Sequence, residues 1–61
     1  MDLEETADFI STDLPKWQRD ENLLFLERIH PIIKAGGTWI YPRAMLIFNK
    51  TEDGFELALD S

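Results

Sequence analysis

The chain has 61 residues, with twelve acidic and six basic side chains, a formal net charge of −6 and no cysteine. A chain this short forms a single domain, residues 1–61, and buries only about 60% of the surface that its unfolded form exposes. The missing cysteine excludes disulfides and thiolate metal sites, and the excess of acid argues against direct binding to nucleic acid, whose phosphates need Lys and Arg.

The N-terminal segment, residues 2–10, is predicted to be a short helix. Apolar residues recur at positions i, i+4 and i+7 from Leu3, and the early acidic residues suit the positive end of a helix dipole. Residues 11–15 then have the composition of a break. Within this break we expect Asp13 to cap the next helix.

The second predicted helix is the longest element and runs from about Leu14 to about His30. Pro31 removes one backbone hydrogen bond and disfavours helical geometry at the residue before it. Two outcomes stay open: the helix ends at His30, or it continues with a kink. The pair Gly36-Gly37 ends the helix in both cases.

The C-terminal third is predicted to be a β-hairpin. Residues 38–50 are β-rich, residues 51–54 have the composition of a hairpin turn, and residues 55–59 return as a strand. If Thr51 faces Phe55, then Lys50 faces Glu56, a favourable pair of opposite charges. Pro42 cannot donate to a ladder, so the first strand is an edge there or begins after it.

This register predicts two apolar faces on the hairpin. One face is expected to carry Met45, Ile47, Phe55, Leu57 and Leu59, and the other Ile40, Ala44, Leu46, Phe48 and Ala58. One helical layer covers only one face, so the second face must meet the N-terminal helix, another copy of the chain or a target. The predicted fold is therefore α+β: one or two N-terminal helices packed on a C-terminal antiparallel β-hairpin, with a sheet that dimerisation can extend.

Catalytic groups are poorly supplied. The only histidine is His30, and no nucleophile stands at a recognisable spacing from it. Gly36-Gly37 follows a helix and precedes a strand, which is the reverse of a phosphate-binding loop. We therefore expect no enzymatic activity and no cofactor.

One spacing imitates a metal site. Five residues fall at calcium-loop positions: Asn49, Thr51, Asp53, Gly54 and Asp60. The first two candidate ligands are neutral, the last is Asp where a bidentate Glu is needed, and the flanks are predicted strands rather than helices. A hairpin turn explains the same residues, so we expect no bound metal.

Two aromatic residues, Trp39 and Tyr41, alternate at period two and are followed on the same side by Arg43. One interpretation is that they pack over a helix. The other is that they form an interface hot spot, where Trp, Tyr and Arg are enriched. The sequence leaves both open.

Charge is segregated along the chain. The net charge is −5 over residues 1–13, +3 over residues 14–50 and −4 over residues 51–61. The simple interpretation is two solvated faces that keep a small protein soluble. The sharper one is that carboxylates on a helix and a hairpin imitate phosphates and bind a basic groove.

The function we expect is protein binding without catalysis, by an acidic inhibitor or regulator of a DNA- or RNA-handling protein. Small phage inhibitors of DNA-repair and restriction enzymes work in this way, but no motif here assigns the chain to a family. The candidate contact residues are Asp2, Glu4, Glu5, Asp8, Trp39, Tyr41, Glu52, Asp53 and Glu56. The alternative is a structural or assembly subunit, such as an obligate homodimer, that buries its apolar hairpin face.

The sequence also predicts where the protein acts. No stretch approaches the roughly 18 apolar residues of a membrane span, and residues 1–5 lack the basic region of a signal peptide. We therefore expect a soluble, cytoplasmic protein that binds no membrane.

Overall fold

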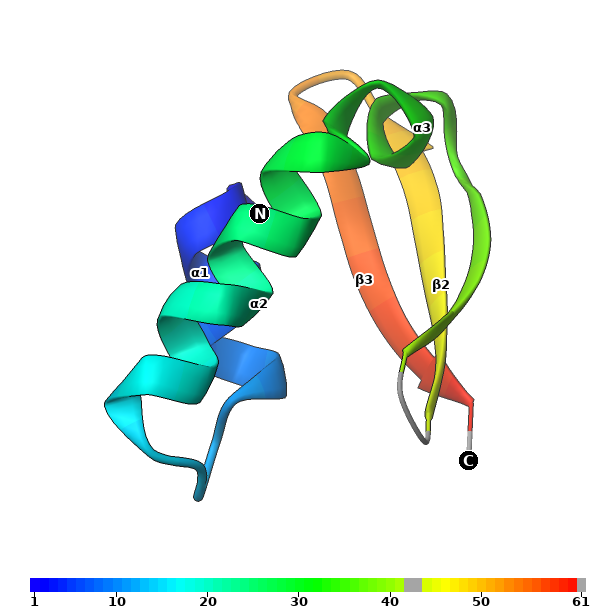
Figure 1. Cartoon of the computed structure of the whole chain (residues 1–61). Helices are drawn as coiled ribbons and strands as arrows, with labels where there is room; N and C mark the ends of the chain where they lie inside the picture. Colours follow the sequence, from blue (N-terminus) through cyan, green and yellow to red (C-terminus); the bar gives the residue numbers. More distant parts are fainter. Residues whose placement is uncertain (42–43, 61) are drawn as a thin grey trace.

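The computed structural model describes residues 1–41 and 44–60, which form three helices followed by three strands (Figure 1). The elements are α1 (Leu3–Ile10), α2 (Lys16–Arg28), α3 (His30–Ala35), β1 (Gly37–Tyr41), β2 (Ala44–Thr51) and β3 (Gly54–Asp60). The strands form one antiparallel sheet in the order β1-β2-β3, so the predicted α+β fold is confirmed. The β-rich segment contributes two strands, so the hairpin is part of a three-stranded sheet. Pro42 and Arg43, and the predictions for them, lie outside the described residues.

The starts of the two long helices differ in how they are capped. The Glu5 backbone N–H donates to the Asp2 carboxylate (2.7 Å), so an acidic residue caps α1. The predicted cap at Asp13 is wrong, because α2 begins at Lys16 after Pro15 and has no side-chain cap. The Asp13 backbone instead adopts φ 69°, a left-handed conformation that Asp tolerates in turns.

Pro31 divides the helical region into two helices. Helix α2 ends at Arg28, Ile29 breaks the helical geometry, and α3 starts at His30 with Pro31 in its first turn. The missing N–H of proline has no helical acceptor in a first turn, so the residue is tolerated there. The predicted stop is confirmed: Gly36 follows α3 at φ 83°, and a Cβ on it would lie 3.2 Å from the Phe48 carbonyl oxygen.

The β2–β3 hairpin has a tighter loop than the sequence suggested. Thr51 pairs with Gly54, so only Glu52 and Asp53 lie in the loop. The predicted Lys50–Glu56 pair is therefore wrong, since Lys50 lies opposite Phe55 and Glu56 lies opposite Asn49. A slip of one residue moves every side chain of a strand to the other face, so the predicted faces are wrong as well.

Because successive side chains alternate, the observed register defines an inner and an outer face of the sheet. The inner face carries Trp39, Tyr41, Ala44, Leu46, Phe48, Lys50, Phe55, Leu57 and Leu59. The outer face carries Thr38, Ile40, Met45, Ile47, Asn49, Thr51, Glu56, Ala58 and Asp60. Burial follows this division, because the buried strand residues Leu46, Phe48 and Phe55 all lie on the inner face.

The core lies between the helices and the inner face. Its buried members are Ala7, Leu26, Ile29, Ile33, Leu46, Phe48 and Phe55. Helix α3 contacts β2 and β3, whereas α1 packs along α2 (Figure 1). The Met1 amino nitrogen also donates to the Phe55 carbonyl oxygen (3.1 Å), which ties the start of the chain to β3.

Two leucines on α2 test this arrangement. Leu26 is fully buried, and Leu24 is 60% exposed. We expect Leu26→Ala to lower the free energy of unfolding by about 2–5 kcal/mol, because it removes buried methyl groups and leaves a cavity. Leu24→Ala, the matched control, should cost less than about 0.5 kcal/mol. Urea denaturation measures both, and an equal loss in the two variants would contradict the helix orientation described here.

Candidate functional site

The residues weighed for catalysis and metal binding lie at the start of a helix and on a hairpin. His30 is half-buried at the start of α3, and the calcium-like spacing falls on the β2–β3 hairpin. Within residues 1–41 and 44–60, no three His, Cys, Asp or Glu side chains are grouped so that they could hold a metal ion. Across the same ranges, every helix is too short or too polar to cross a membrane.

The N-terminal acidic block is partly neutralised by Arg19 of α2. Its guanidinium donates to Glu4 (2.8 Å), to Asp8 (2.7 Å) and to Asp20 (3.1 Å). The bond with Asp8 contributes most to raising the pKa of Arg19 further above its ordinary value. Of the four residues of this block that were expected at a partner surface, two, Glu4 and Asp8, are therefore paired within the chain.

The other two acidic residues of that block differ in role. Asp2 accepts the Glu5 N–H and so caps α1, whereas the Glu5 side chain is exposed and makes no ion pair with any described residue. The bond between Met1 and Phe55 brings this end of the chain beside β3. Asp2 follows Met1 and Glu56 follows Phe55 in the sequence. The backbones of the two acidic blocks, which are far apart in sequence, therefore approach each other at this bond.

A buried amide joins α2 to the loop that precedes it. Asn22 is 1% exposed, its Nδ2 donates to the Ser11 hydroxyl (2.6 Å), and its Oδ1 accepts from Gln18 Nε2 (3.2 Å). A buried amide is stable when both its donor and its acceptor are paired. Sequence reasoning missed Asn22, although its spacing of four residues from Leu26 placed it on the apolar side of α2.

The aromatic pair packs against a helix. Trp39 and Tyr41 lie half-buried on the inner face, and their ring centroids are 5.9 Å and 4.6 Å from that of Phe25 on α2. Both rings therefore point away from the outer face and toward the helices. Burial, assisted by the charge of Glu21, raises the pKa of Tyr41 above its ordinary value.

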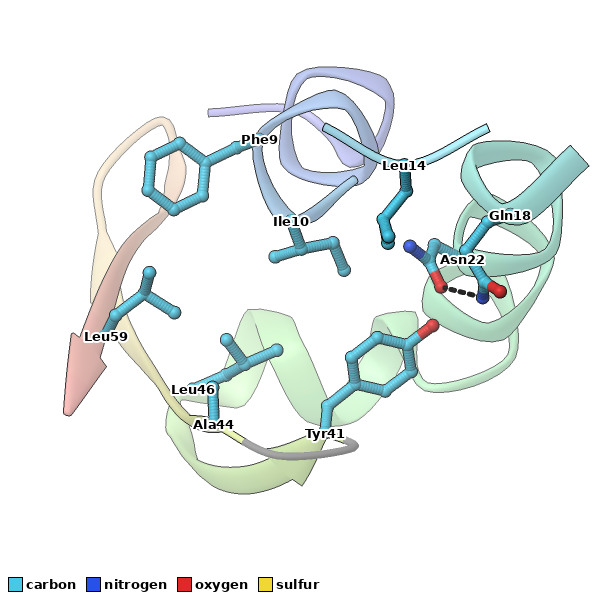
Figure 2. Close-up of a pocket in the computed structure, with 9 residues that line it drawn as sticks. All are labelled: Phe9, Ile10, Leu14, Gln18, Asn22, Tyr41, Ala44, Leu46 and Leu59. Carbon is cyan, nitrogen blue, oxygen red and sulfur yellow. Dashed lines mark hydrogen bonds between the residues drawn. The ribbon is translucent and has the colours of Figure 1, made fainter. Parts of the chain in front are cut away.

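An open groove of about 640 Å³ separates the end of α1 and the first half of α2 from the sheet (Figure 2). Phe9, Leu14 and Leu59 line it and are each about half exposed. Figure 2 shows the side-chain amides of Gln18 and Asn22 at one side of the groove and Phe9 with Leu59 at the other. The helices and the sheet are thus closely packed at the α3 end and separate at the opposite end.

The outer face of the sheet is the second uncovered apolar surface. Ile40, which is 72% exposed, pairs with Met45, and Ile47 pairs with Ala58. These four residues form a continuous apolar centre, which we call the outer patch.

The described charged side chains on the face of the outer patch are acidic. Glu56 and Asp60 lie on the same face, and Glu52 and Asp53 lie in the adjoining loop. The described residues of this face include no Lys or Arg, since Lys50 lies on the inner face. Lys34 and Lys50 line a hollow together with Glu52 and Asp53, so basic charge adjoins the loop but not the outer face itself. The structure thus brings together Glu52, Asp53 and Glu56 from the predicted contact residues, and it adds the outer patch beside them.

No family model, curated protein or solved structure matched the chain. Its function is therefore inferred from its own surface geometry and charge. Among the described residues, the groove and the outer face both expose apolar side chains, and the outer face combines them with acidic charge.

The Arg19 network predicts a specific order of stability. Arg19→Gln removes all three bonds, two of which join α1 to α2, so the melting temperature of this variant should fall most. The melting temperature of Arg19→Lys should fall less, because a lysine keeps the charge but lacks the planar guanidinium that reaches several carboxylates. Arg28→Gln, which removes the same charge from the end of α2, is the control. An equal fall for Arg19→Gln and Arg28→Gln in thermal unfolding would show that net charge alone matters.

Tyr41 is the only tyrosine, so its ionisation can be followed by absorbance without interference from another tyrosine. We expect a pKa above the ordinary value of about 10 in the folded chain and a return to that value in urea. Glu21→Gln should lower the folded value only in part, because burial is the larger cause. Since the folded pKa is raised, this group's stabilisation is complete below about pH 10 and is lost as the pH rises through the folded pKa. A folded pKa no higher than that in urea would contradict the packing of Tyr41.

Proposed function

We propose that the chain is a non-catalytic, cytoplasmic protein-binding module that docks its outer sheet face on the basic surface of a DNA- or RNA-handling protein. The observation that supports this proposal is the outer patch accompanied solely by acidic charge among the described residues of that face. A surface of this kind attracts Lys and Arg side chains around an apolar contact. The absence of cysteine suits a reducing compartment.

The outer patch supplies affinity in this proposal. Exposed apolar area gains roughly 25 cal/mol per Å² when it leaves water. A standard interface takes about 800 Å² from each partner, whereas the whole chain exposes 4437 Å². The contact therefore extends beyond four side chains and includes the β2–β3 loop.

In this proposal the carboxylates orient the chain on its partner and raise the rate of association. Glu52, Asp53, Glu56 and Asp60 lie along one strand and its loop, and in the bound state they take the places of nucleic-acid phosphates. Glu5 and Asp2 reinforce this field from the nearby N-terminus, whereas Arg19 partly cancels the charges of Glu4 and Asp8. We assign Trp39 and Tyr41 to the support of β1 from its inner face.

Competition with DNA tests the proposal. Affinity capture with the immobilised chain supplies the partner, and a fluorescent DNA duplex bound to that purified partner then serves as the probe. The wild-type chain should displace the duplex, and displacement should weaken at least about tenfold between 50 and 200 mM salt. The triple variant Glu52→Gln, Asp53→Asn, Glu56→Gln should lose most of this activity.

The matched control removes three exposed charges from other surfaces, with Asp13→Asn, Glu21→Gln and Glu27→Gln. Both triple variants have the same net charge, so only the position of the charges differs. We expect the control to compete nearly as well as the wild type. Equal loss in the two triples, or displacement that salt does not weaken, would count against docking through the outer face.

A further inference from the structure

Strand β1 is an exposed edge of the sheet that lacks the residues which usually protect an edge. It lies at one side of the sheet, paired only with β2, and Figure 1 shows no described element beyond it. Its five residues, Gly37–Tyr41, include no charged side chain and no proline. Natural proteins usually protect such edges with lysine, proline or a covering segment, because an open edge pairs with other strands.

The backbone groups of β1 that point to this edge belong to Thr38 and Ile40. Since the Met1 amino nitrogen bonds the Phe55 carbonyl, Phe55 directs its backbone away from β2. Lys50, which lies opposite Phe55, therefore directs its backbone away from β3. Residues of an antiparallel strand alternate between its two neighbours, so Leu46, four residues before Lys50, also points away from β3 and bonds toward β1, where Trp39 is its partner. The β1 residues on either side of its partner therefore point outward, where their N–H and C=O groups are unpaired by the sheet.

The opposite edge of the sheet is less suited to pairing. Met1 already occupies the Phe55 carbonyl of β3, and Glu56 and Asp60 add like charges along that strand. For two chains that each carry a net charge of −6, β1 offers an approach that places no carboxylate opposite another. Strand β1 is thus the edge at which a second copy meets the least repulsion.

We infer that two copies of the chain pair through β1 in an antiparallel, two-fold symmetric arrangement, which makes a six-stranded sheet. Trp39 lies opposite the Trp39 of the second copy, and Thr38 exchanges backbone hydrogen bonds with Ile40 on each side of the axis. Gly37 then faces Tyr41, so the residue across from each tyrosine has no side chain to crowd it. This register uses all five residues of β1 and all of its outward backbone groups.

The inferred dimer leaves the outer face open and places two outer patches on one continuous sheet. It stands independently of the proposed function, since it follows from the open edge of β1 and requires no basic partner. The salt dependence distinguishes the dimer from the proposed function. Screening by salt weakens the attraction to a basic partner but relieves the repulsion between two acidic copies. Self-association should therefore strengthen with salt while competition with DNA weakens.

Sedimentation over a concentration series tests the inference. Because a five-residue edge contact is smaller than a standard interface, we expect a dissociation constant on the order of 10–100 µM, and a smaller one at higher salt. Ile40→Lys places the usual edge-protecting residue at an exposed position and should abolish the dimer while leaving the circular dichroism unchanged. Ala58→Lys, on the outer face but distant from β1 in the sheet, makes the same change in charge and should dimerise like the wild type.

Hydrogen exchange identifies the surface directly. The amides of Thr38 and Ile40 should be protected at high concentration and should exchange quickly on dilution. A chain that stays monomeric up to about 1 mM overturns the inference. So does a dimer that Ala58→Lys disrupts and Ile40→Lys does not, or one whose protection falls on β3, because each indicates a different contact.

Discussion

The register of the β2–β3 hairpin is the constraint on which the rest of the structure depends. With Glu52 and Asp53 alone in the loop, Leu46, Phe48 and Phe55 turn toward the helices and supply three of the seven buried core residues. A shift of one residue between β2 and β3 would place the side chains of one strand on the opposite face, so that either Leu46 and Phe48 or Phe55 would turn to solvent. The same two-residue loop therefore decides both what holds the fold together and which acidic side chains a partner can meet.

A chain of this size has one helical layer, and that layer covers only part of one face. Helix α3 closes the core over Phe48 through Ile33, while α1 and α2 diverge from the sheet and leave the groove. The outer face and the β1 edge remain uncovered because no further element is available to cover them in the described residues. Small domains commonly complete such surfaces by association, and this fold offers both a face and an edge for it.

The two acidic blocks serve different purposes despite their similar composition. On α1, Glu4 and Asp8 bind Arg19 and Asp2 caps the helix, so these charges contribute to the helical layer itself. Around the hairpin, Glu56 projects from a face that carries no described base, so its field extends into solvent, whereas Glu52 lines a hollow together with Lys34 and Lys50. Acidity by itself did not distinguish these roles, because the position of Arg19 decides them.

The sequence by itself determined the α+β class, the helix over residues 2–10, the helix stop at Gly36 and the presence of a C-terminal hairpin, because periodicity, glycine and turn composition act over a few neighbouring residues. Only the tertiary structure decided the hairpin register, the division of the β-rich segment into two strands, and the pairing of Arg19 with Glu4. The predicted grouping of residues into two faces was wrong for the same reason, because it depends on which residues lie opposite each other across strands. Local propensity does not specify contacts between residues far apart in sequence, such as Met1 with Phe55, and these contacts place the acidic charges on the molecule's surface.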